Sequence, residues 1–205
     1  MPTTLVLDCV GTACSVALFD EGTLVAQEHH EIGRGHVERL MPLIAGLPDN
    51  GRADRIAVNA GPGSFTGVRI GLSVARALGL AWEAEVVGYS ALDLTAALAR
   101  CDVHHRPLCV VLHGGHGEFF TQNYSTDGVA EGEFASLSPA GVAEWAHGRK
   151  LVGNAAAAPA LLEGGLTGET INLRAADFAL LNAEQLSDAN PHYGRAPDAA
   201  IKAIS

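Results

Sequence analysis

The sequence has few basic residues and no long apolar segment, and these two absences exclude several classes of protein. Its 205 residues include 13 Lys and Arg against 23 Asp and Glu, a net charge of −10. An acidic chain gains little counterion-release energy from nucleic acid, so any work on nucleic acid needs a basic partner. The longest apolar helical run, Ile70 to Trp82, contains Arg76 and is shorter than the roughly 20 residues of a membrane span. The N-terminus also lacks a basic region, so we expect no signal peptide and a cytoplasmic location.

Cysteine is scarce, and its spacing carries little signal. The four cysteines, Cys9, Cys14, Cys101 and Cys109, include no CxxC pair. Zinc sites and redox dithiols commonly use that spacing, so its absence argues against both. We therefore expect buried free thiols in a reducing compartment. With 48% apolar and 18% charged residues, the composition also excludes a disordered chain.

The predicted elements repeat once along the chain. Apolar alternation and turn residues predict three antiparallel strands within residues 3–32, followed by helix, strand, helix, strand and helix up to residue 99. A polar, histidine-rich segment, Cys101 to Arg106, is a candidate hinge. Beyond it the pattern again predicts three strands and a helix, with further helices over 155–162 and 175–187.

Two lobes of this kind are typical of the duplicated ribonuclease-H-like fold, the actin-like or ASKHA architecture within the α/β class. We therefore expect an N-terminal actin-like lobe over residues 1–100 and a C-terminal actin-like lobe over residues 101–205. The segment after Asn190 carries proline and aromatic residues, and we expect it to return as a tail packed on the surface. Fold class alone does not define a function.

The first predicted hairpin holds a candidate nucleotide site. Asp8 ends the first strand, and Gly11 and Thr12 form the turn that follows. In the duplicated fold, an aspartate and a small-residue turn at this place contact ATP phosphate and its magnesium, and backbone N–H groups can cradle phosphate. The alternative is an aspartate that stabilises a tight turn, and the sequence favours this second interpretation.

A glycine-rich loop, Gly61-Pro62-Gly63-Ser64, stands directly before a predicted helix. Free N–H groups and the helix dipole at such a point suit an anion. No Gly-Lys-Ser/Thr follows, so this is not a Walker loop, and GPGSFTG lacks the GxSxG frame of a nucleophile elbow. The alternative, with equal support, is a rigid elbow in which Ser64 caps the helix and the glycines permit the turn.

Histidine offers a weaker signal. His113 and His116 lie on either side of Gly114-Gly115, and Glu118 is the nearest carboxylate. Zinc hydrolases place HExxH on a helix, with the glutamate as general base. That arrangement is missing here, so turn or surface histidines are the favoured interpretation, and a zinc hydrolase is the weakest functional hypothesis.

Two predicted helices carry surfaces that suit packing or binding. The helix that ends near Trp82 has a ridge of small residues at every fourth position: Gly67, Gly71, Ala75 and Gly79. Glycine inside a helix costs about 1 kcal/mol relative to alanine, so the ridge predicts another backbone close by. The opposite face is a candidate interface and bears Arg69, Ser73, Arg76 and Leu80. The helix over 36–45 has an apolar face of Val37, Leu40, Met41 and Ile44, with Leu43 outside it.

A string similar to the signature of the TsaB (YeaZ) family occupies residues 61–71, GPGSFTGVRIG. Three further segments resemble that family in the same order. They are the first hairpin (Leu5 to Asp8 and Cys14 to Leu18), the helix His36 to Ile44, and a PxYxRxPxA tail at Pro191, Tyr193, Arg195, Pro197 and Ala199. The resemblance is dense in the first lobe and thin in the second.

The resemblance implies an accessory subunit in the synthesis of threonylcarbamoyladenosine, beside the anticodon of tRNAs that read codons starting with A. In that family the catalytic paralogue TsaD holds metal and threonylcarbamoyl-adenylate, and TsaE is an ATPase of the same assembly. This chain would then carry no catalytic residue, cofactor or metal, and would meet tRNA only indirectly. Helices of its first lobe would bind TsaD, and the same surface allows a homodimer when the chain is alone.

The resemblance also assigns residues. The implied partner interface comprises His36, Arg39, Leu40, Leu43, Arg69, Ser73 and Arg76. The signature residues Gly61, Gly63, Ser64, Thr66 and Gly67 form the candidate anion loop, and Asp8, Gly11 and Thr12 form a degenerate nucleotide site.

The sequence departs from the family in two places. Where the family usually has DARRGEVY in its second lobe, residues 113–120 read HGGHGEFF, so the aspartate and arginines are lost while Gly117 and Glu118 remain. The first turn has Cys9-Val10-Gly11 where the family tends to have small hydroxylated residues, which weakens the case for nucleotide binding by this chain alone. The alternative function is a small ATP-dependent phosphotransferase of the actin-like class that uses Asp8 and the loop 61–64.

Overall fold

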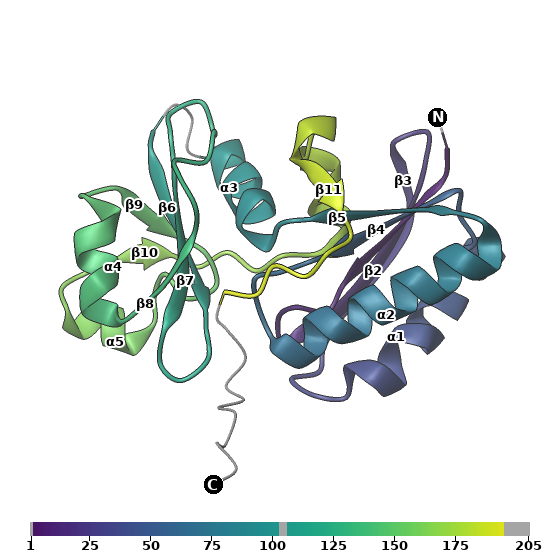
Figure 1. The fold of residues 1–205 in the computed structure, drawn as a ribbon, viewed down its shortest axis with the longest axis horizontal. Coiled ribbons are helices and arrows are strands. Elements are labelled where there is room, and N and C mark those ends of the chain that lie inside the picture. The colour runs from purple at the N-terminus through teal and green to yellow at the C-terminus, as the bar shows by residue number, and fades with distance from the viewer. Residues whose placement is uncertain (1, 103–105, 195–205) are drawn as a thin grey trace, which may run out of the picture.

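The structure is a computed structural model and describes residues 2–102 and 106–194. Its strands form two separate mixed sheets, which lie at opposite ends of the molecule with helices packed against each (Figure 1). Part of the candidate hinge, and Arg195, Pro197 and Ala199 of the resembling tail, lie outside the described residues.

The first sheet is built around its N-terminal strand. β1 (Thr4–Asp8), β2 (Ala13–Asp20) and β3 (Thr23–Glu31) form an antiparallel meander. On the other side of β1, β4 (Arg55–Asn59) and β5 (Glu85–Tyr89) add in parallel. A late strand, β11 (Leu186–Asp188), closes that edge antiparallel to β5, so the order is β11-β5-β4-β1-β2-β3.

The second sheet repeats this arrangement. β6 (Leu108–His113) pairs antiparallel with β7 (Phe119–Tyr124), which pairs antiparallel with β8 (Ala135–Leu137). β9 (Lys150–Val152) and β10 (Gly168–Glu169) add in parallel on the other side of β6. The order β10-β9-β6-β7-β8 matches the first sheet strand for strand, apart from β11. The predicted duplicated, ASKHA-type α/β fold is confirmed.

Helices cover both faces of the first sheet. α1 (His36–Ala45), the 3₁₀ turn η1 (Pro48–Gly51) and α2 (Phe65–Trp82) bury Leu5 and Leu7 of β1 on one face. α3 (Ala91–Asp102) and η2 (Ala175–Leu180) cover Val6 on the other face. This alternation along β1 is the period-two pattern of a strand buried on both sides. The second sheet packs against α4 (Pro139–Ala146) and α5 (Pro159–Glu163).

The small-residue ridge of α2 lies against the sheet, as its spacing predicts. A Cβ at Gly67 would collide with the Cys9 carbonyl oxygen, and one at Gly79 would collide with the Val86 side chain. Gly71 and Ala75 are buried along the same row. Gly67 and Gly79 are therefore required by a close helix–strand approach.

Two predicted helices need correction: the helix predicted over 155–162 starts late, and the one predicted over 175–187 is not a single helix. Residues 155–158 form turns in which the Ala155 amide donates to the Val111 carbonyl, and the helix begins only at Pro159. Proline disfavours helical geometry in the residue before it, which explains the late start. The stretch 175–187 divides into η2, a second 3₁₀ turn η3 (Ala183–Gln185) capped by Asn182, and β11. Its last residues leave helical geometry because the open edge of β5 offers backbone hydrogen bonds.

Candidate functional site

A cleft of about 1200 Å³ lies between the lobes. Its wall combines the β1–β2 turn, the loop before α2, the start of α1, the β6–β7 turn and the segment 192–194. The structure thus brings together Asp8, Gly11 and Thr12 with Gly63, Ser64, Thr66 and Gly67. His113, His116 and Glu118 line the same cleft from the second lobe. Gly61 is buried behind this wall.

The Asp8 carboxylate is hydrogen-bonded to groups within the protein. Its carboxylate accepts hydrogen bonds from the Asn59 side-chain amide at 2.8 Å, the Val10 backbone amide at 3.2 Å and the Tyr89 hydroxyl at 3.5 Å. Burial raises the pKa of Asp8, while these donors act in the opposite direction. The side chain is only 4% exposed, so it fastens the hairpin to β4 and β5 rather than presenting a free carboxylate.

Asn59 is a site residue that the sequence interpretation missed. Its amide nitrogen donates to Asp8 and its Oδ1 accepts from the Gly61 amide at 3.0 Å, so one side chain joins the first hairpin to the loop before α2. Asn59 ends a strand whose other central residues, Ile56, Ala57 and Val58, are apolar and buried. A polar residue at the end of a buried parallel strand is the signal that could have found it.

The glycine-rich loop packs onto the first hairpin. The Ser64 amide donates to the Val10 carbonyl at 2.9 Å, and the Gly67 amide donates to the Ser64 hydroxyl at 3.2 Å. A Cβ at Gly63 would lie 2.7 Å from the Val10 carbonyl oxygen. Three amides of the loop, those of Gly61, Ser64 and Gly67, therefore have partners inside the chain, and the geometry favours the rigid elbow.

The second-lobe residues also have structural roles. The Glu118 carboxylate accepts from the Ser136 hydroxyl at 2.8 Å, which ties the start of β7 to β8. The His113 amide donates to the Asn154 side chain at 3.0 Å. Gly153, which directly follows β9, lies so close to β6 that a Cβ would collide with the Val111 carbonyl oxygen. Within residues 2–102 and 106–194, no group of three His, Cys, Asp or Glu is placed to hold a metal ion.

The cleft residues therefore do not fit a magnesium–nucleotide complex held in the usual way for this fold. The carboxylate at the expected position is buried and hydrogen-bonded to Asn59, and its raised pKa reflects that burial. The turn hydroxyl of Thr12 donates to Glu31 at 2.9 Å, which adds negative charge at the cleft wall.

The implied interface on α1 needs a correction. His36, Leu40 and Leu43 are buried, with exposed fractions of 8%, 0% and 8%, and they pack against the sheet. The outward face of α1 instead presents Val37 and Met41, and Arg39 is exposed as expected. The apolar face expected from spacing is thus divided: Leu40 and Ile44 lie in the core, and Val37 and Met41 lie on the surface. The division arises because α1 lies on β2 through Leu40 and Ile44.

A groove of about 460 Å³ lies between α1 and α2 on that outward surface. We call it the α1–α2 groove, and its lining residues are Val37, Met41, Phe65, Thr66, Arg69, Ile70, Ser73 and Val74. Val37, Met41 and Phe65 are 62%, 45% and 49% exposed. The Arg69 guanidinium stacks 3.7 Å from the centre of the Phe65 ring. The groove is therefore an exposed apolar surface with a cation beside it.

The arginine face of α2 is exposed as predicted, but its two arginines also hold the C-terminal segment. Arg69 donates to the Tyr193 hydroxyl at 3.2 Å, and the Tyr193 ring lies 5.3 Å from Phe65. Arg76 donates to the Ala189 carbonyl at 2.7 Å. Residues 189–193 thus run along the edge of the implied interface and continue into the cleft.

Comparisons with known proteins lead to proteins named for the threonylcarbamoyladenosine modification of tRNA or to YeaZ structures. A family model described as TsaD, tRNA N6-adenosine threonylcarbamoyltransferase, matches residues 25–145, more than half of the chain. The chain is 34% identical over 137 residues to the tRNA threonylcarbamoyladenosine biosynthesis protein TsaB of Escherichia coli K12, covering 63% of this chain and 58% of that protein. It is 31% identical over 103 residues to the TsaB of Bacillus subtilis, covering 48% and 45%. The chain thus spans about half the length of the curated relatives it matches.

Two solved structures from Pseudomonas aeruginosa share the fold across their whole length. An uncharacterized protein with similarity to peptidase YEAZ has a TM-score of 0.77 and 28% identity over 95% of this chain and 100% of its own. YeaZ has a TM-score of 0.71 and 26% identity over 94% and 100%. In the described part of this chain, no helix has the length and apolarity that crossing a membrane requires.

Proposed function

The chain belongs to the TsaB (YeaZ) family of tRNA threonylcarbamoyladenosine biosynthesis proteins, and on that premise we propose that it is a non-catalytic subunit that binds TsaD and supports threonylcarbamoyl transfer to tRNA. The modified base is the adenosine beside the anticodon, in tRNAs that read codons starting with A. TsaE joins the same assembly through the complex. ATP and metal belong to TsaD and TsaE in this proposal.

The exposed α1–α2 groove is the observation that carries the proposal. Apolar residues at this level of exposure are costly on a free surface unless a partner covers them. An aromatic ring beneath an arginine, as at Phe65 and Arg69, is typical of the anchor residues of protein interfaces. The groove lies on α1 and α2, the helices of the first lobe that we propose as the TsaD-binding surface. A homodimer through the same groove is the expected state when TsaD is absent.

The cleft supports a non-catalytic role. Asp8 is satisfied by Asn59 and Val10, Ser64 caps α2, and Glu118 is paired with Ser136. A nucleophile or general base needs a side chain that can reach a substrate, and each of these is occupied in holding the fold. The alternative phosphotransferase would need Asp8 to leave its three donors, so we do not favour it.

The charge of the chain supports indirect contact with tRNA. A net charge of −10 repels a phosphate backbone, so the basic surface for tRNA would come from the partner. An acidic subunit can still assemble with a tRNA-binding partner, because the docking surface proposed here is largely apolar.

A matched pair of variants tests the docking surface. Val37 on the groove and Val129 in the second lobe are 62% and 65% exposed, so Val37→Asp and Val129→Asp make the same change at similar exposure. Val37 is the second residue of α1, where an aspartate suits the helix dipole, so the variant should fold. Val37→Asp should weaken binding to purified TsaD by about tenfold or more, and Val129→Asp should leave it unchanged. Equal binding by both would remove the groove from the proposal.

Reconstitution tests the role itself. TsaD and TsaE, supplied with tRNA and threonylcarbamoyl-adenylate, should modify tRNA efficiently only when this chain is added. The chain alone should modify none. Equal modification with and without the chain would overturn the proposed function, whatever the binding assay shows.

A further inference from the structure

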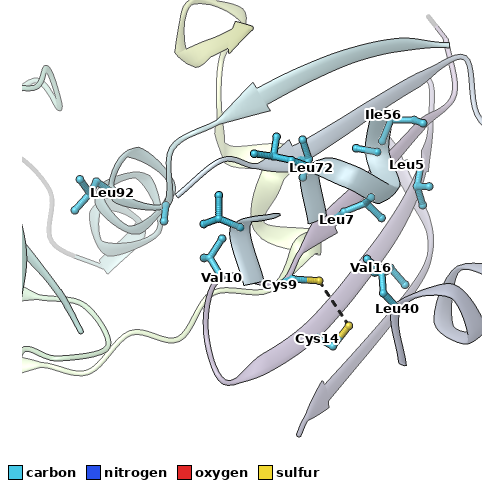
Figure 2. Packing of buried hydrophobic residues seen from close by; sticks show 14 of the residues in the cluster. Leu5, Leu7, Cys9, Val10, Cys14, Val16, Leu40, Ile56, Leu72 and Leu92 are labelled. Atoms are coloured by element: carbon cyan, nitrogen blue, oxygen red, sulfur yellow. Dashed lines mark hydrogen bonds between the residues drawn. The ribbon is translucent and has the colours of Figure 1, made fainter. Parts of the chain in front are cut away.

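Two cysteines face each other at the end of the first hairpin. Asp8 of β1 is paired with Ser15 of β2, and one step further along the same antiparallel register come Cys9 and Cys14. Their sulfur atoms lie 3.8 Å apart, and both thiols are free. Figure 2 shows the pair pointing toward each other, with Cys9 near Val10 and Cys14 near Leu40.

This geometry is compatible with a disulfide without rearrangement of the strands. Residues directly opposite each other in an antiparallel pair have Cα atoms about 4.5–5.5 Å apart, within the range that a disulfide spans. The sulfurs are already in contact, so bond formation requires small side-chain rotations. The sequence separation of five residues concealed this, because CxxC spacing is only one way to bring two thiols together.

From this juxtaposition we propose that Cys9 and Cys14 are a modification site that forms a reversible intramolecular disulfide on exposure to a hydroperoxide. The inference does not depend on the proposed function, because it concerns a reaction of the chain alone.

The chemistry balances with hydrogen peroxide as the oxidant. The Cys14 thiolate attacks one peroxide oxygen and the O–O bond breaks, which converts Cys14 to a sulfenic acid. The departing hydroxide takes up the proton lost by the thiol and becomes water. The Cys9 sulfur then attacks the Cys14 sulfur, its proton is lost, and the sulfenic hydroxyl departs as water. Two thiols lose two hydrogens, and one peroxide becomes two waters. A small dithiol reductant reverses the oxidation.

The surroundings assign the roles of the two thiols. The Cys9 thiol can donate to the Cys14 sulfur, and this hydrogen bond lowers the pKa of Cys14. The same contact, together with burial, raises the pKa of Cys9. Cys14 is therefore the thiol that reacts first with the oxidant, and Cys9 is the one that resolves the sulfenic acid.

The position of the hairpin determines how an oxidant would reach the two thiols and which parts of the protein the disulfide would affect. Both cysteines are buried, with exposed fractions of 1% for Cys9 and 0% for Cys14, but the residues between them, Val10 to Ala13, line the interlobe cleft. A small oxidant therefore reaches the sulfurs by passing this turn from the cleft. The Cys9 carbonyl packs against Gly67 of α2, and Cys14 belongs to the core beneath α1. The disulfide would therefore lock the turn that joins the cleft to both helices of the α1–α2 groove.

Mass spectrometry of the folded, full-length chain tests the inference. The wild type is treated with hydrogen peroxide and then alkylated under denaturing conditions. The alkylating agent should then modify two fewer cysteines than in the untreated protein, and a peptide map should link Cys9 to Cys14. Dithiothreitol should restore both thiols. Cys101→Ser, which removes an exposed thiol elsewhere, should leave the link intact. Retention of both thiols, or oxidation of the wild type at Cys101 alone, would overturn the proposal.

Two further measurements separate the disulfide from a general effect of oxidation. Neither Cys14→Ala nor Cys9→Ala should form the intramolecular link. Cys9→Ala should instead retain the sulfenic acid at Cys14, which a dione probe would trap. Oxidised wild type should unfold at a higher denaturant concentration than reduced wild type, because the crosslink restricts the unfolded chain. An identical unfolding midpoint for the two forms would count against a lock on the hairpin.

Discussion

Replacing Gly67 by alanine should destabilise this protein, although alanine is the better helix former. Gly67 lies in the first turn of α2, and its position is set by the Ser64 cap and by β1 beneath it. An alanine Cβ would collide with the backbone carbonyl oxygen of Cys9. A carbonyl of a strand end cannot rotate away as a side chain does, so either α2 or the hairpin must move.

The magnitude follows from two opposing effects. The change from glycine to alanine inside a helix gains about 1 kcal/mol from backbone entropy. Overpacking a well-filled interior costs about 1–3 kcal/mol, and the cost is at its upper end when the clash is with backbone. We therefore expect a net loss of about 1–2 kcal/mol in the free energy of unfolding.

Gly71 supplies the matched control on the same ridge. A Cβ there would lie 3.2 Å from the Val58 Cγ2 atom and 4.0 Å from the Cys9 Cβ, contacts that a small side-chain shift can relieve. Gly71→Ala should thus be neutral or slightly stabilising. Urea unfolding of both variants, followed by circular dichroism, measures the difference. A Gly67→Ala variant as stable as Gly71→Ala would refute the claim that α2 rests on the Cys9 carbonyl.

Further predictions concern Asp8 and the C-terminal segment. Burial raises the pKa of Asp8 above its ordinary value of 3.8, so folding favours the protonated form of this carboxyl. The contribution of Asp8 to the free energy of unfolding therefore falls as the pH rises from below 3.8 through the pKa in the folded state. Relative to Asp8→Asn, the wild type should therefore lose stability over that window, as pH-dependent urea unfolding would measure; parallel curves would contradict this. Arg76→Ala removes the bond to the Ala189 carbonyl, so hydrogen exchange at the His192 amide, which donates to the Ala60 carbonyl, should accelerate while exchange in β1 stays unchanged.

Local sequence signals predict much of the first lobe. The bounds of α1 and β5 and the close packing of the glycine ridge follow from periodicity and residue size. These are local properties, in which spacing along the chain directly sets which side chains share a face. The second lobe is less predictable because its late elements depend on distant partners. β11 exists because β5 has a free edge, and no pattern within residues 186–188 specifies a strand.

The direction in which α1 presents its apolar residues shows a second limit. Val37 and Met41 have the same spacing as Leu40 and Ile44, yet the first two are exposed and the last two are buried. A helix with apolar residues around more than half of its circumference can pack on either side. The sheet beneath α1 determines which of its apolar residues are buried, and those left exposed line the α1–α2 groove.

By itself, the sequence determined the fold class, the family and the presence of a glycine-rich turn before α2, because each rests on residue types at short, fixed spacing. Only the hydrogen bonds of Ser64 and Gly67 in the structure distinguished a rigid elbow from an anion loop at that turn. The tertiary structure alone decided that Asn59 joins Asp8 to that turn, that the arginines of α2 hold residues 189–193, and that Cys9 and Cys14 are in contact. Those relations join residues through strand pairing and helix docking, whose register no local pattern encodes.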